Sequence, residues 1–239
     1  GRSGDTSGIL ISSRSNWSKL ITDFLKNKKL LKQGIDYSGN NIGQMSQILN
    51  YFSFPESIAV PVASNSNYFK EKHFSFPYSF SKNNYSDTQN ISGQENILIN
   101  CLLSSEMIEK DDAIYPGMKE IADAFVHYFH YSESATVNGK YSFSDSAWED
   151  ILREHVDAGI PVIYSFTGQQ SENTCIIDGY WYNRLFHLNF GTGINNNGFF
   201  RLTGFNQGIF SLTDMHAAIF DLYPPDLASQ EFNGKIVFF

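Results

Sequence analysis

Cysteine is scarce in this chain of 239 residues, which contains only Cys101 and Cys175. Two cysteines can form one bridge at most, so a disulfide-based scaffold is excluded, and two free buried thiols are the interpretation we prefer. No apolar run approaches the roughly 20 residues that a membrane-spanning helix needs. No signal peptide opens the sequence either, so the sequence by itself does not indicate a compartment.

Charge is also sparse and mostly negative. Charged residues make up 18% of the chain, and the formal net charge is −8. An acidic chain without a basic cluster repels phosphate backbones, which argues against nucleic acid as a partner. Hydrophobic residues (41%) and aromatics (15%) are sufficient for a substantial core. We therefore expect a flexible leader over residues 1–12 and a single globular domain over 13–239.

The first part of the chain has the periodicity of helices. The clearest example places five apolar side chains on one stripe before Pro55 stops it, namely Ile42, Met45, Ile48, Leu49 and Phe52. Further helices are predicted over 17–25, 95–110, 116–131 and 144–158. Residues 64–92 are rich in Ser, Asn, Tyr and Phe without a helical period, which predicts a long and partly extended surface excursion.

After Gly159 the pattern changes to short apolar runs separated by turn residues. The predicted strands are 161–166, 174–179, 184–190, 199–204, 217–222 and 235–239. Helices first and a meandering antiparallel sheet second are typical of an α+β fold.

Three motifs at fixed offsets carry a family resemblance. The first is Ile176-Ile-Asp-Gly179, followed by His187-Leu-Asn189 and Gly198-Phe-Phe-Arg201, and the others are Gly159-Ile-Pro-Val-Ile-Tyr164 and Ser46-Gln-Ile-Leu-Asn-Tyr51. From about residue 17 to residue 224, the chain resembles the streptopain family of papain-fold cysteine peptidases. The resemblance implies a papain-like α+β fold, with an N-terminal helical half packed on a C-terminal antiparallel sheet.

The same alignment places asparagine at both positions of the family's catalytic dyad. The family's cysteine lies seven residues before the glutamine that matches Gln47, which is the position of Asn40, and its histidine corresponds to Asn173. A thiolate at a helix N-terminus is stabilised by the helix dipole, whereas asparagine there is a common helix cap. Asn173 does not titrate near neutral pH, so it can act as neither base nor acid. The resemblance therefore implies a peptidase framework without its nucleophile or its base.

Three further positions correspond to the family's site. Asn189 matches the asparagine that orients the imidazole, and because its partner is absent we expect it to have a structural role. Phe190 replaces the tryptophan beside that asparagine. Lys19 stands where the family has the glutamine that helps to form the oxyanion hole.

A few other side chains are of types that can carry chemistry. Ser38 lies two residues before Asn40, but no base is assigned to it, so a loop or capping hydroxyl is the preferred interpretation. Cys175 could border the cleft, yet a cysteine on a predicted buried strand is usually a small apolar filler. His127 and His130 have i, i+3 spacing but lack a third ligand, so we expect neither a metal nor a cofactor.

The sequence thus predicts a pseudopeptidase with a binding or structural role. A peptide, a protein or a glycan is the expected partner, in the residual cleft or at residues 64–92, and the oligomeric state stays open. The alternative is an active peptidase whose dyad is misassigned in this alignment. The resemblance implies a bacterial protein that is secreted or displayed on the cell surface.

Overall fold

The structure is a computed structural model that describes about half of the chain. The described residues are 6–10, 40–52, 54–55, 57–59, 79–81, 97–98, 100–101, 104, 117–167, 172–182, 184–191, 197–202, 206–207, 210–211, 214–225 and 235–236. Lys19, Ser38 and the predicted helix at 17–25 lie outside them. Of the predicted helix at 95–110, residues 97–98, 100–101 and 104 are described, and all of them are helical.

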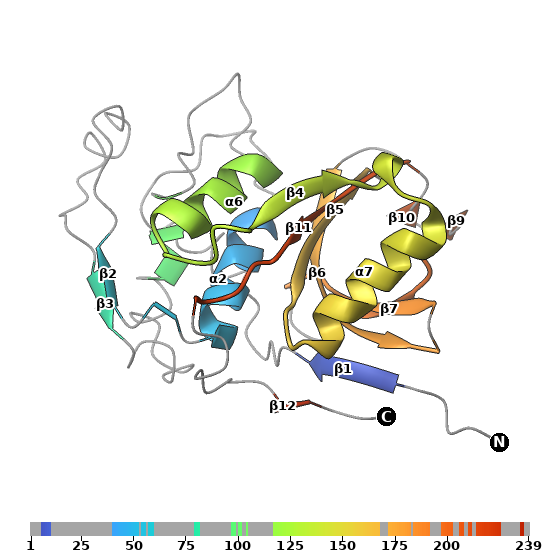
Figure 1. Ribbon diagram of the computed structural model, residues 1–239, viewed down its shortest axis with the longest axis horizontal. Coiled ribbons are helices and arrows are strands. Elements are labelled where there is room, and N and C mark those ends of the chain that lie inside the picture. Colours follow the sequence, from blue (N-terminus) through green and yellow to red (C-terminus); the bar gives the residue numbers. More distant parts are fainter. Residues whose placement is uncertain are drawn as a thin grey trace.

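Helix α2 (Asn40–Phe52) begins at the residue where the alignment places the start of the nucleophile helix. All five residues of its apolar stripe are buried, because α2 packs into the core between α6 (Met118–His127) and the sheet. Polar side chains on its other faces are buried too, namely Gln44, Ser46 and Gln47. Figure 1 shows α2 and α6 together on one side of the molecule. Helix α2 is therefore an internal element, not a surface helix.

Helix α7 (Asp145–Asp157) covers the opposite side of the sheet (Figure 1). It begins as its sequence predicts, because the Ser144 side chain accepts a hydrogen bond from the Ala147 N–H. It ends at Asp157, and Gly159, just beyond the C-terminal cap Ala158, has a left-handed φ of 78°. The short 3-10 helix η1 (Lys140–Ser142) leads into α7 from strand β4.

The main sheet is antiparallel and has eight strands among the described residues. One path through it runs β12-β1-β6-β5-β11-β4, and β7 and β8 continue from the other edge of β6. The strands are β1 (Thr6–Leu10), β4 (Thr136–Gly139), β5 (Val162–Thr167), β6 (Glu172–Trp181), β7 (Leu185–Asn189), β8 (Gly198–Phe200), β11 (Asp214–Phe220) and β12 (Lys235–Ile236). Two small ribbons pair β2 (Ser57–Ala59) with β3 (Ser79–Ser81), and β9 (Asn206–Gln207) with β10 (Phe210–Ser211).

Residues 6–10, which lie within the segment 1–12 that is expected to be a flexible leader, form a strand. They form β1, which pairs with β6 at Gly8↔Gly179 and with β12 at Ile9↔Ile236. The segment Thr-Ser-Gly-Ile-Leu has a weak strand pattern by itself. It is a strand because the long strand β6 offers backbone partners to it, which is a tertiary effect.

Successive side chains of the central strands belong in turn to two different hydrophobic clusters, one on each face of the sheet. Ile163 on β5 and Ile176 on β6 pack with α2 and α6, whereas their neighbours Tyr164 and Cys175 pack with α7. Because successive side chains of a strand point to opposite faces, a strand covered on both sides reads as a continuous apolar run. This explains the run Ile160-Pro-Val-Ile-Tyr164. No helix in the described part of the chain combines the length and apolarity that crossing a bilayer requires.

Candidate functional site

The start of α2 meets β6 at the position where the sequence predicts the degenerate dyad. The Gln44 amide nitrogen donates a hydrogen bond of 3.3 Å to the Thr174 carbonyl oxygen. Gln44 lies about one helical turn after Asn40, and Thr174 directly follows Asn173, which pairs with Phe166 on β5. The bond therefore ties α2 to β6, one helical turn after Asn40 on the helix and directly beside Asn173 on the strand. We call this region the amide junction and define it by Asn40, Gln44, Gln47, Asn173 and Asn189.

Two buried glutamines organise the helical side of the amide junction. The Gln47 amide nitrogen donates to the Gln44 side-chain oxygen at 2.9 Å. The Gln47 side-chain oxygen is buried and has no hydrogen-bond partner among the described residues. On the sheet side, Gly191 lies directly against this pair: a Cβ added there would stand 2.7 Å from the Gln47 amide nitrogen. Gly191 also has a left-handed φ of 70°.

Gly191→Ala tests how tightly the amide junction is packed. We expect a loss of about 1–3 kcal/mol in the free energy of unfolding, because a left-handed non-glycine residue is strained and the new methyl group displaces Gln47. Gly159→Ala is the matched control, since Gly159 is also left-handed but its Cβ would meet nothing closer than the Tyr51 hydroxyl at 3.9 Å. Urea unfolding of both variants separates the two effects. Equal losses of unfolding free energy in the two variants would show that Gln47 moves away from the new methyl group without destabilising the protein.

Asn189 is held by its own loop. Its side-chain oxygen accepts from the Gly191 N–H at 3.0 Å and from the Asn197 amide at 3.3 Å. The Asn197 side-chain oxygen in turn accepts from the Phe190 N–H at 2.9 Å. These bonds occupy the side-chain oxygen of Asn189, the same kind of acceptor that would orient an imidazole. Phe190 is buried and its ring lies 6.4 Å from that of Phe166, the residue paired with Asn173.

Both thiols lie in the core. Cys101 and Cys175 are free and fully buried. Burial raises the pKa of the Cys101 thiol to about 12. Burial, followed by the nearby charge of Asp178, raises the pKa of the Cys175 thiol well above its usual value. A buried thiol that stays protonated is a poor nucleophile, so these contacts support the interpretation of Cys175 as an apolar filler.

A buried ion pair lies further along β6 and β7. The His187 Nδ1 lies 2.5 Å from an Asp178 carboxylate oxygen, and the two side chains are 13% and 0% exposed. Burial opposes the charged imidazolium, but the hydrogen bond and the charge of Asp178 outweigh it and raise the pKa of His187. The register of β6 and β7 shifts between Ile177 and Gly179, which makes Asp178 the extra residue of a β-bulge. Both residues belong to the motifs of the family resemblance, but their pairing does not follow from the sequence.

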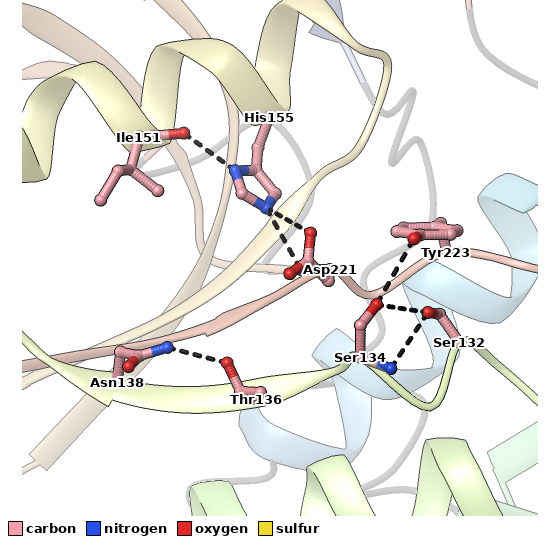
Figure 2. Close-up of polar contacts among 8 residues, drawn as sticks. All are labelled: Ser132, Ser134, Thr136, Asn138, Ile151, His155, Asp221 and Tyr223. Carbon is pink, nitrogen blue, oxygen red and sulfur yellow. Dashed lines mark hydrogen bonds and ion pairs between the residues drawn. The ribbon is translucent and has the colours of Figure 1, made fainter.

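A second histidine–carboxylate contact lies at the end of α7 (Figure 2). The His155 Nδ1 donates to the Ile151 carbonyl oxygen at 2.9 Å, and its Nε2 contacts the Asp221 N–H at 3.2 Å and the Asp221 carboxylate at 3.3 Å. Both ring nitrogens are thus engaged with the backbone. Nearby, Ser134 contacts the Ser132 hydroxyl at 2.6 Å and the Tyr223 hydroxyl at 3.4 Å. This arrangement ties α7, β11 and the loop before β4 together and has no base that is free to activate a serine.

The remaining described histidines do not form a metal site. His127 and His130 are both exposed, and no group of three His, Cys, Asp or Glu side chains that could hold a metal ion is found within the described residues. His216 contacts the Tyr164 hydroxyl through its Nδ1 at 2.7 Å, and that hydroxyl also accepts from the Trp148 indole at 3.3 Å. Trp148 and Tyr164 belong to the core, which gives this chain of contacts a packing role.

Comparison with known proteins decides the family. The model of the peptidase C10 family matches residues 17–200, about three quarters of the chain. This chain belongs to the peptidase C10 family. The streptopain of Streptococcus pyogenes serotype M28 (strain MGAS6180) is 26% identical over 176 residues, which cover 67% of this chain and 44% of the relative. A streptopain of Streptococcus pyogenes serotype M1 matches to the same extent. The chain thus spans less than half the length of these relatives.

Solved structures show that the fold is the papain-like α+β fold that was predicted. The active wild-type interpain A cysteine protease of Prevotella intermedia superposes with a TM-score of 0.64 at 20% identity, covering 92% of this chain and 95% of that one. A prointerpain A fragment of the same organism gives a TM-score of 0.61 over 92% of this chain and 72% of that one. The resemblance to the peptidase C10 (streptopain) family and the predicted fold class are confirmed.

Sequence reasoning missed part of the amide junction. Gln47 belongs to one of the family motifs, whereas Gln44 lies outside them. The available signal was weak: Gln44 and Gln47 have i, i+3 spacing on a helix that also contains Asn40, Asn41, Ser46 and Asn50. Such buried amides need partners, which predicts a polar neighbour without identifying Thr174 as that neighbour.

Proposed function

We propose that this chain is a catalytically inactive member of the peptidase C10 family that acts as a binding module, secreted or displayed on the surface of a bacterium. The single observation that carries the proposal is the pair of asparagines at the family's dyad positions: Asn40 at the start of α2 and Asn173 on β6. An asparagine side chain neither forms a thiolate nor takes up a proton near neutral pH.

The surroundings of the amide junction support this proposal. The acceptor of Asn189 is engaged with Gly191 and Asn197. Three described histidines have other partners: His155 contacts Asp221, His187 contacts Asp178 and His216 contacts Tyr164. Both cysteines are buried in the core. These contacts support the proposal, because each of these histidine and cysteine side chains is engaged outside the amide junction.

A binding role suits side chains of this kind. Primary amides donate and accept hydrogen bonds without a change of charge, so they recognise a peptide backbone, a protein loop or sugar hydroxyls. The contact between helix and strand supports this role, since the helix that begins at the amide junction is tied to strand β6 by the hydrogen bond of Gln44. The origin of the relatives, Streptococcus pyogenes and Prevotella intermedia, supports a bacterial setting.

The inactivity is tested on the unmodified protein. We expect no covalent labelling by an epoxide inhibitor of cysteine peptidases and no cleavage of casein above the buffer control, because both thiols are buried and no imidazole is assigned beside them. Mass spectrometry of the intact protein reports labelling, and interpain A serves as the positive control. Stoichiometric labelling together with casein turnover would instead establish the alternative, an active peptidase with a misassigned dyad.

The binding half of the proposal needs its own readout. Peptides from a tryptic digest of casein are equilibrated with the protein, and those retained are identified by mass. We expect intact peptides to be retained and Asn173→Trp, which fills the amide junction, to abolish retention. Asn138→Trp on the edge strand β4 is the matched control and should retain them. Loss of retention in both variants, or in neither, contradicts a site at the amide junction.

A further inference from the structure

Strand β4 lies at an edge of the main sheet. It pairs with β11, from Ala217↔Gly139 to Phe220↔Thr136, and with no second strand in the part of the chain that the structure describes. Thr136 is exposed, and Val137 is 37% exposed. Apart from the ladder to β11 and one bond between two of its own side chains, β4 makes no hydrogen bond with the described residues. The outer backbone groups of such an edge strand are open to a further strand.

The sequence of β4 does not protect this edge against pairing. The segment Thr136-Val-Asn-Gly139 contains no charged residue and no proline, and its register with β11 has no bulge. Proteins commonly protect exposed edges with lysine, proline or a bulge, because an unprotected edge pairs with other chains. Strand β12, at the other end of the same path through the sheet, begins with Lys235. Strand β4 therefore has the composition of a strand that is paired on both sides.

The register of β4 with β11 fixes which way its side chains face. Val137 lies opposite Ile219, which packs with α2 and α6, and Asn138 lies opposite Ala218, which packs with α7. Thr136 shares the face of Asn138, because side chains alternate along a strand. Figure 2 shows these two side chains together: the Asn138 amide nitrogen donates to the Thr136 hydroxyl oxygen at 2.8 Å. One face of the edge is therefore aliphatic, and the other carries a hydrogen-bond donor and an acceptor.

A second copy of this chain complements the edge in one register. In an antiparallel pair with two-fold symmetry, one residue lies opposite its own counterpart. With Val137 as that residue, the two valines meet on the aliphatic face, and Thr136 of each copy lies opposite Asn138 of the other. Each Asn138 amide can then donate to the Thr136 hydroxyl across the interface in place of the one in its own chain. Opposed β-branched side chains and hydrogen-bonded side-chain pairs are contacts that stabilise a sheet.

The distribution of charge also favours a second copy over an unrelated peptide. Strand β4 carries no charged side chain by which it could select another sequence. The net charge of −8 makes two copies repel each other, so contact is favoured where both surfaces are locally neutral. Glu133 precedes β4 and Lys140 follows it, so an antiparallel pair brings the acidic end of each copy to the Lys140 end of the other. Lys140 already contacts Asp145, so this attraction is modest, but no unbalanced like charges face each other.

We propose that two copies of this chain pair through β4 into a symmetric dimer, in which the main sheet continues from one copy into the other and Val137 lies opposite Val137 of the second copy. Only a short strand is paired, so the interface is small, and we expect a dissociation constant of roughly 10–100 μM. The proposal goes beyond the proposed function and does not rest on it, because no residue of β4 belongs to the amide junction.

The first test places a cysteine at the centre of the proposed pair. Val137→Cys should form a disulfide between two copies when it is treated with oxidised glutathione, because opposite residues of an antiparallel pair have Cβ atoms close enough for a bridge. Asn138→Cys is the matched control. Its counterpart in the second copy is two residues out of register, so we expect its bridge to form at least about tenfold more slowly. Non-reducing gel electrophoresis follows both rates, and the unmodified protein is the blank, because its own cysteines are buried.

The second test measures the dimer without a covalent bond. Sedimentation equilibrium of the unmodified protein should show a mass that rises with concentration from one copy toward two. Val137→Lys places two like charges opposite each other and should raise the dissociation constant at least about tenfold. Ser146→Lys is the control, because it adds the same charge at an exposed position of α7, outside the edge, and should leave the dissociation constant unchanged. Circular dichroism verifies that each variant is folded.

Three results would overturn the proposal. The first is a protein that stays monomeric up to about 200 μM, well above the expected dissociation constant. The second is a bridge at Asn138→Cys that forms as fast as the one at Val137→Cys, which would show a different register or random collision. The third is a casein peptide that the unmodified protein retains and Val137→Lys does not, since this would identify a peptide as the occupant of the edge.

Discussion

Replacing His187 by leucine should lower the free energy of unfolding by about 3–5 kcal/mol, the usual cost of removing one partner from a buried ion pair. The Asp178 carboxylate is fully buried and lies 2.5 Å from the His187 ring. Leucine has a comparable volume but no positive charge and no N–H. The variant therefore retains most of the packing against Phe199 and loses the group that compensates a buried charge.

The matched control is Lys119→Leu. Lys119 also pairs with an aspartate, Asp123, but both of these side chains are well exposed. Exposed pairs of this kind contribute little, since water solvates each charge and the side chains lose entropy on pairing. Urea unfolding followed by circular dichroism at neutral pH measures both variants. If the loss of unfolding free energy in His187→Leu is as small as that in Lys119→Leu, other contacts of Asp178 stabilise its buried charge.

The same pair makes stability depend on pH in a defined direction. Asp178 raises the pKa of His187 in the folded state, so the folded protein holds this proton more tightly than the unfolded chain, whose histidine titrates near 6.5. The extra stability is fully present below that value and is lost as the pH rises through the folded pKa. Asp178→Asn removes the charge that raises the pKa of His187, and with it the loss of stability that follows as the pH rises above the unfolded value near 6.5.

The helices and the central strands could be predicted because their signals are local. The stripe from Ile42 to Phe52 has a helical period, and it forms a helix whose start at Asn40 agrees with the alignment. The apolar run after Gly159 forms β5, because both faces of that strand are covered. In each case, the same residues that carry the pattern are the ones that the core buries.

The elements that were missed depend on partners distant in sequence. Strand β1 forms on β6, more than 160 residues away, and its own composition resembles a loop. Gln44 bonds to Thr174 across 130 residues. The Asp178–His187 contact spans nine residues but needs a β-bulge to form, and a bulge leaves no signature in residue spacing. Asp178 and His187 both belong to the family motifs, but only the structure shows that they contact each other.

The strongest test of the degenerate dyad is its restoration. Asn40→Cys places a thiol at the first residue of α2, where the helix dipole favours the thiolate. Asn173→His adds an imidazole on β6, next to the residue that Gln44 ties to α2. We expect the double variant to react with iodoacetamide at pH 6 at least about tenfold faster than Asn40→Cys alone, because an imidazolium that pairs with the thiolate lowers the pKa of the thiol. The rate is followed by mass spectrometry, and the unmodified protein serves as the blank, because its own thiols are buried.

The control for this experiment moves the thiol by a single residue. Asn41→Cys combined with Asn173→His turns the thiol about 100° around the helix, since an α-helix has 3.6 residues per turn. Asn41 is also an asparagine in the first turn of α2, so composition and helix position are nearly matched. Faster labelling of the Asn40 variant than of the Asn41 variant identifies Asn40 and Asn173 as the former dyad. Equal rates would show that the imidazole does not reach position 40 and that the alignment of the two positions is wrong. We expect casein cleavage by the restored protein to stay far below that of interpain A, because Asn189 remains bound to Gly191 and Asn197 and does not orient the new imidazole.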